Sequence, residues 1–177
     1  MSEIAVNISI PLDEDKCLRR QCPKCRREFK VMVKDEELEE IAKKGLESFM
    51  TKEEEETPEP ERVDVEENVC PYCGQSSDEW WTDEQKAYIG VHAENIMKRL
   101  LNEQLIRPMK HKFGRSSRGP VSIEFKGEEL RESEPWISPE TNDMKIFALP
   151  CCKRKIKVIP DWSAKVHCFF CGFPHNP

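Results

Sequence analysis

The sequence predicts a small α+β protein in which two zinc ribbons, each built on short antiparallel β-hairpins, are joined by one long amphipathic helix. Cysteine pairs recur at the spacing of zinc knuckles, and an apolar row with helical spacing follows residue 82. Only 37% of the 177 residues are hydrophobic, whereas 35% are charged. Such a chain has difficulty building one large core, so we expect bound metal to supply much of its folding free energy.

The first predicted metal site combines two knuckles that are far apart in the sequence, Cys22-Pro23-Lys24-Cys25 and Cys70-Pro71-Tyr72-Cys73-Gly74. Each Cys-x-x-Cys turns two thiolates toward one point, and four thiolates make the tetrahedral set of a structural Zn²⁺ site. The chain has nine cysteines. An odd count at knuckle spacing argues against a secreted disulfide scaffold and for zinc in a reducing compartment, so we expect a cytoplasmic protein.

These patterns divide the chain into three segments. We expect residues 1–80 to form the N-terminal ribbon, with an acidic helical insertion at about 34–69 between its knuckles. Residues 29–33 (FKVMV) are the strand that leaves the first knuckle. Residues 81–119 hold the long helix and a basic loop, and residues 120–177 form the C-terminal ribbon. The insertion costs little, because loop closure adds only ~0.6 kcal/mol for each doubling of loop length.

The long helix has a recognisable start. Thr82 is a candidate N-cap and Gln85 stands at the capping-box position, three residues later. Proline and glycine predict a stop or kink near Pro108 and an end by Gly114. The apolar row consists of Ile89, Ala93, Ile96, Met97, Leu100, Leu101 and Leu105. Such a row is usually core, and a partner-binding or dimer helix is the alternative.

The second predicted metal site follows a strand at 145–149 and surrounds another at 156–159. Its expected ligands are Cys151, Cys152, Cys168 and Cys171. The first pair is adjacent, unlike a Cys-x-x-Cys, so a site of Cys151, Cys168 and Cys171 with His167 or His175 stays open. Two sites imply two Zn²⁺ per chain. Cys17 has no partner at knuckle spacing and is expected to be a packed free thiol.

Three stretches, LRRQCPKC, CPYCG followed by EWWTDEQ, and PCC(x15)HCFFCG, together resemble an uncharacterised family of bacterial proteins with two zinc ribbons around a central helix. The resemblance covers most of the chain. It implies a bacterial, cytoplasmic origin, a ligand position at Cys152 and none at Cys17. It implies no activity or substrate.

Charge is unevenly distributed along a chain whose net charge is -6. The acidic residues are concentrated in 35–69 and 124–143, so a basic face is compatible with the negative total. The candidate nucleic-acid contacts are Arg19, Arg20, Arg26, Arg27, Lys110, Lys112, Arg115 and Arg118. We expect a zinc-stabilised binding module, with DNA or RNA marginally preferred as ligand. The alternative is an adaptor that binds a protein through the long helix, Trp80-Trp81 or the acidic insertion.

Motifs for catalysis are missing from the sequence. It has no glycine-rich phosphate loop, nucleophile elbow or His-Glu-x-x-His helix, and four thiolates close a zinc site to activated water. No apolar run approaches the ~20 residues of a membrane span. We therefore expect neither an enzyme nor a membrane protein.

Overall fold

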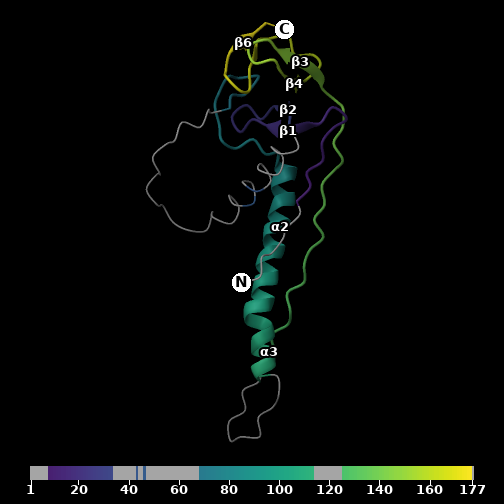
Figure 1. The fold of residues 1–177 in the computed structure, drawn as a ribbon, viewed down its shortest axis with the longest axis vertical. Coiled ribbons are helices and arrows are strands. Elements are labelled where there is room, and N and C mark those ends of the chain that lie inside the picture. Colours follow the sequence, from purple (N-terminus) through teal and green to yellow (C-terminus); the bar gives the residue numbers. More distant parts are fainter. Residues whose placement is uncertain (1–7, 34–42, 44–45, 47–67, 114–124, 177) are drawn as a thin grey trace, which may run out of the picture.

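The computed structural model describes residues 8–33, 43, 46, 68–113 and 125–176 (Figure 1). A body of short strands and cysteine knuckles lies at one end, and one long helix projects from it. The main sheet has four strands in the order β1-β2-β4-β3. The strands are β1 (Cys17–Gln21), β2 (Glu28–Met32), β3 (Lys145–Leu149) and β4 (Arg154–Val158), and a second sheet pairs β5 (Val166–His167) with β6 (Pro174–His175).

The two cysteine-bearing hairpins meet directly in this sheet. Strand β2 of the hairpin at the first knuckle pairs antiparallel with β4 of the C-terminal hairpin, with Lys30 opposite Lys157 and Val31 opposite Ile156. The predicted small α+β class and the strands at 29–33, 145–149 and 156–159 are therefore confirmed, within one or two residues at their ends. The hairpins form one continuous sheet, and the helix projects from it (Figure 1).

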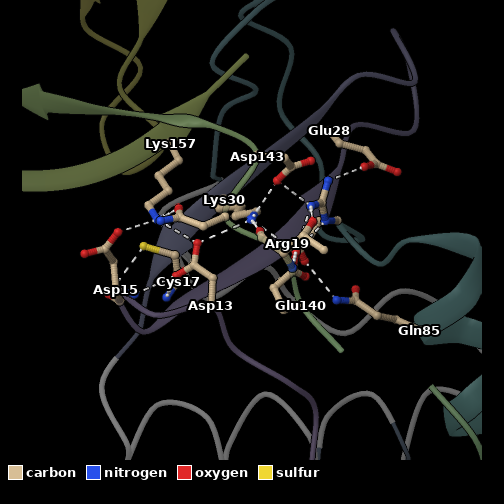
Figure 2. A network of polar contacts seen from close by, with 12 residues as sticks. Asp13, Asp15, Cys17, Arg19, Glu28, Lys30, Gln85, Glu140, Asp143 and Lys157 are labelled. Atoms are coloured by element: carbon tan, nitrogen blue, oxygen red, sulfur yellow. Dashed lines mark hydrogen bonds and ion pairs between the residues drawn. The ribbon is translucent and has the colours of Figure 1, made fainter. Parts of the chain in front are cut away.

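The two faces of the sheet differ in chemistry. Side chains alternate along a strand, so Phe29 and Val31 of β2 share one face with Ile156 and Val158 of β4 and belong to the main apolar core. The opposite face presents Lys30 and Lys157 to a cluster of carboxylates, and Arg19 of β1 joins them (Figure 2). Segments distant in the sequence cover this charged face, since Asp13 precedes β1 and Asp143 precedes β3.

The long helix begins as predicted. Thr82 accepts a hydrogen bond from the Gln85 backbone N–H, and the Gln85 side chain accepts one from the Thr82 backbone, which completes a capping box. The helix comprises α2 (Asp83–Leu101), a π-helical turn η1 (Asn102–Ile106) and α3 (Arg107–Phe113). Its first turns pack Tyr88 and Ile89 against Ile10 and Leu18.

Pro108 does not end the helix, which continues to Phe113. The π-helical turn lies immediately before the proline, and the Arg107 N–H bonds to the Asn102 carbonyl five residues earlier. Proline has no N–H and its ring crowds the preceding turn, so a locally wider turn accommodates it without breaking the helix. The sequence rule identified the position of the irregularity, but the helix extends past it.

Residues 125–143, here called the strap, run in an extended conformation beside the helix and return the chain to the sheet (Figure 1). Two helix asparagines hold the strap through its backbone. Asn95 donates to the Ser133 carbonyl at 2.7 Å and accepts from the Ser133 N–H at 2.9 Å. Asn102 does the same with Leu130, at 2.8 Å for both bonds. The strap therefore covers one side of the helix by main-chain pairing.

Several predictions fall on residues outside the described part of the chain. These include most of the acidic insertion at 34–69, together with the candidate nucleic-acid contacts Arg115 and Arg118. Cys17 is 1% exposed, and within the described residues it belongs to neither cysteine group. Among the described helices, none combines the length and apolar content needed to cross a bilayer.

Candidate metal centres

Four turns of the chain share one backbone geometry, in which an N–H donates to the carbonyl four residues earlier and the donating residue has a positive φ. In the first knuckle Arg26 (φ 60°) donates to Cys22 at 2.9 Å. In the second, Gly74 (φ 70°) donates to Cys70 at 3.0 Å. Lys153 to Leu149 (2.8 Å) and Gly172 to Cys168 (2.9 Å) complete the set. All four cysteine-bearing turns therefore share the backbone geometry of a knuckle, which is compatible with metal binding.

The first centre brings together the four predicted ligands, Cys22, Cys25, Cys70 and Cys73, whose Sγ atoms all lie within 4.8 Å of one another. Cys22 and Cys73 are 3.7 Å apart, and Cys25 and Cys70 are 3.8 Å apart. Four sulfurs bound tetrahedrally at about 2.3 Å from Zn²⁺ lie about 3.8 Å from each other. The thiols are therefore spaced for a zinc ion.

The electrostatics of the first centre also favour a cation. Burial raises the pKa of both Cys22 and Cys70. Burial acts in the same direction on Cys25, but a hydrogen bond from the Arg27 backbone helps to hold the pKa of that thiol below its ordinary value. Backbone N–H groups of Cys25 and Tyr72 also point at the sulfurs of Cys22 and Cys70. A bound divalent metal would supply the positive charge that several buried thiolates require.

The second centre gathers Cys151, Cys152 and Cys168 within 4.8 Å of one another, and Cys171 Sγ lies 3.5 Å from Cys151 Sγ. The knuckle geometry explains why its first half looks irregular. The turn spans Leu149-Pro150-Cys151-Cys152. Cys152 therefore aligns with the second cysteine of a Cys-x-x-Cys, and buried Leu149, which cannot bind metal, aligns with the first. Proline at the second place of the motif, as in Cys22-Pro23 and Cys70-Pro71, is the sequence signal for this alignment.

The two histidines near the second centre have different surroundings. His167 Nδ1 lies 3.4 Å from the Gly172 carbonyl, and its ring packs close to Gly74. His175 Nε2 lies 3.1 Å from Cys151 Sγ. Of the two alternative ligands considered from the sequence, His175 is the one in contact with a thiol of the described part of the chain.

The two centres share one packed interior. Val69 donates its N–H to the Phe169 carbonyl at 2.8 Å, and His167 donates to the Pro71 carbonyl at 2.9 Å. Phe169 stacks edge-on or tilted against Trp80 and Phe29, with ring centroids 5.4 and 5.5 Å apart. The segments that carry the two centres are therefore packed against each other.

Of the basic residues proposed for nucleic-acid binding, the six that the structure describes do not gather on one surface. Arg19 forms ion pairs with Glu28, Glu140 and Asp143 at 2.7–2.8 Å. Arg20 is 8% exposed and lies over the Trp81 ring. Arg26 and Arg27 remain exposed at the first knuckle, where Arg26 pairs with Asp83 at the start of the helix. Lys110 and Lys112 belong to α3, at the opposite end of the helix (Figure 1).

A hollow of about 350 Å³ lies between the start of α2 and the end of the strap. Its charged walls are already satisfied, because Arg19 binds Glu28 and Glu140, and Glu84 accepts the Ser138 N–H at 2.9 Å. The hollow offers no free acid–base pair.

No protein-family model, curated protein or solved structure matches the chain. The metal centres therefore rest on their own geometry.

Proposed function

We propose that the chain is a zinc-stabilised adaptor that binds another protein through the outer half of its long helix. The observation behind this proposal is a row of exposed apolar side chains at Met97, Leu101 and Leu105, which are 46%, 42% and 51% exposed. Their spacing of four residues aligns them along one side of a helix. An apolar row of this kind fits an amphipathic helix of a partner.

The surroundings of the row support this choice. The helix is anchored at its first turns, through Tyr88 and Ile89, to the sheet body that the cysteine centres hold together. Its outer half projects from that body with the strap on one side (Figure 1). Zinc would then act structurally, as a rigid base that presents the helix, because closed thiolate sites leave no position for substrate.

The proposal is tested by replacing Leu101 and Leu105 together with Gln, which removes apolar surface but keeps helix propensity. Native purification of the tagged wild-type protein should yield a stoichiometric protein partner, and the double variant should lose it while zinc content and helical circular dichroism stay unchanged. Glu103→Gln, an exposed change between the two leucines, is the matched control and should keep the partner. Equal recovery of the partner by the wild type and the double variant would contradict the proposal.

Nucleic acid remains the second candidate, supported by exposed Lys24, Arg26 and Arg27 at the first knuckle and by Lys112 on α3. Fluorescence anisotropy with labelled DNA and RNA between low and physiological salt tests it. Each neutralised phosphate contributes about -0.9 to the salt slope for duplex and about -0.7 for single strands. Arg26→Ala with Arg27→Ala should weaken binding and flatten the slope. Absence of binding by the wild type at low salt would remove this candidate.

A further inference from the structure

The second metal centre contains one more donor than a tetrahedral zinc ion uses. Cys152, Cys168 and Cys171 occupy ligand positions of the two knuckles, but Leu149 fills the remaining one. Two other donor groups could supply the ligand that Leu149 does not, namely Cys151 within the same turn and His175 on β6. A four-coordinate metal at this centre therefore has two candidates for its last ligand.

Cys151 is an unusual ligand because of its place in the turn. It stands at the third position of the knuckle, which Lys24, Tyr72 and Phe170 hold in the other three. Its side chain is exposed, as is that of Cys171, whereas Cys22 and Cys70 of the first centre are 0% exposed. The thiol that completes the second centre is thus open to solvent.

His175 is held beside this thiol by the second sheet. It is the β6 partner of Val166 on β5, and Val166 lies two residues before Cys168 in the sequence. The rings of Phe173 and Phe147 pack against its imidazole, with centroids 5.2 and 6.4 Å away. Its Nε2 atom is directed at Cys151 Sγ, 3.1 Å away. The imidazole nitrogen therefore lies in contact with the sulfur that it would replace, and a shift toward Cys152 and Cys168 would bring it into their group.

We propose that the second centre is a five-donor Zn²⁺ site, in which His175 takes the coordination position of Cys151 when that thiol is withdrawn. Zn²⁺ accepts thiolate and imidazole in the same tetrahedral geometry, so Cys₄ and Cys₃His sites are both stable. Cys151 can then be alkylated or otherwise modified without loss of the metal. The inference concerns this centre alone and does not depend on the partner of the helix.

The test uses Cys151→Ala, His175→Ala and the double variant, with zinc per chain measured by elemental analysis after purification without added metal. Each single variant should retain two zinc ions, and the double variant should retain about one. The first centre serves as an internal reference, since a value of one shows that it is still folded. Cys25→Ala is the matched control, because no histidine bonds a first-centre thiol among the described residues, and it should lose one zinc.

A spectroscopic measurement distinguishes replacement of Cys151 by His175 from retention of zinc by the three remaining thiolates alone. In the cobalt-substituted protein, Cys151→Ala should lower the sulfur-to-cobalt charge-transfer absorption by the share of one thiolate while the bands typical of tetrahedral cobalt remain. In the zinc protein, the side-chain nitrogen resonance of His175 should move to a metal-bound value only in Cys151→Ala. Loss of one zinc by Cys151→Ala, an unshifted His175 resonance, or two zinc ions in the double variant would each overturn the proposal.

Discussion

Lys30 and Lys157 face each other across the β2–β4 pair, and both ammonium groups bind the same carboxylate oxygen, Asp13 Oδ2, at 3.3 and 2.7 Å (Figure 2). All three side chains are at most 1% exposed. Lys30 also binds Asp143 at 2.9 Å and the Thr141 carbonyl, and Lys157 binds Asp15 at 2.5 Å. Two adjacent buried ammonium groups repel each other, so the carboxylates allow β2 and β4 to pair at this point.

Asp13→Asn should destabilise the protein by about 3–5 kcal/mol, because it leaves two buried ammonium groups with less countercharge. Chemical denaturation followed by circular dichroism measures the loss. The control is Glu79→Gln, which breaks the partly exposed Lys86–Glu79 pair and should cost less than about 1 kcal/mol. Similar losses in the two variants would show that the buried cluster is not a special stabiliser of the sheet.

Cys17 should make stability depend on alkaline pH. Burial, with the negative charge of Asp13, raises the pKa of this thiol from its ordinary value of 9.0 to about 11. A folded pKa above the unfolded one gives stabilisation that is complete below pH 9 and is lost as the pH rises through 11. Between pH 8 and 11 the wild type should therefore lose on the order of 1–2 kcal/mol more than Cys17→Ala.

The measured quantity is the difference in stability between the wild type and Cys17→Ala. Lys30 and Lys157 also titrate at alkaline pH, since their carboxylate partners raise their pKa values against the effect of burial. Both lysines are present in both proteins. Zinc content should stay at two in Cys17→Ala. Parallel stability curves for the two proteins would refute the assignment of this pH dependence to Cys17.

Gly74→Ala should cost more stability than Gly172→Ala. Both glycines have positive φ, at 70° and 73°, and both follow the last cysteine of a knuckle. A Cβ at Gly74 would lie 3.1 Å from the His167 ring, which packs between the centres, whereas at Gly172 it would meet a Val69 methyl at 3.4 Å. Backbone strain of about 1–2 kcal/mol is common to both. Thermal melts should rank the variants in this order, and the reverse order would mean that His167 moves aside freely.

Zinc should leave the protein in two steps. The second centre exposes two thiols, Cys151 and Cys171, so a reagent can remove one ligand more than His175 could replace, while Cys22 and Cys70 are fully buried. A thiol-reactive mercurial with a colorimetric zinc indicator should release about one equivalent rapidly and a second one slowly, with unfolding. Structural zinc contributes on the order of 10 kcal/mol to folding, so Cys22→Ser should unfold the N-terminal ribbon. Release in a single phase, or iron in place of zinc, would contradict this description.

Local sequence signals predicted the local structures well. Cys-Pro-x-Cys fixes a knuckle through neighbouring residues alone, and Thr82 with Gln85 fixes a helix start in the same way. The strands at 29–33 and 145–149 are short runs rich in apolar residues, which is also a local pattern. The four thiols of the first centre followed from spacing, because tetrahedral zinc demands two such knuckles.

These local signals could not predict which distant segments of the chain pair with each other. Alternation places Lys30 and Lys157 away from the apolar core, which ordinarily means facing solvent, yet Asp13 and the end of the strap bury them. The predicted basic cluster at Arg19 and Arg20 is likewise occupied by internal partners. Charge counted along the sequence cannot reveal which cations meet a carboxylate from a segment more than a hundred residues away.

The sequence by itself determined that this chain forms cysteine knuckles, a capped helix and short antiparallel strands, since each depends on residues within one turn or one strand. The tertiary structure decided that β2 pairs with β4, that Leu149 stands where the knuckle would otherwise have its first cysteine, and that His175 lies beside Cys151. These outcomes depend on which surfaces are buried together, and burial is a property of the assembled chain that no short stretch of sequence contains.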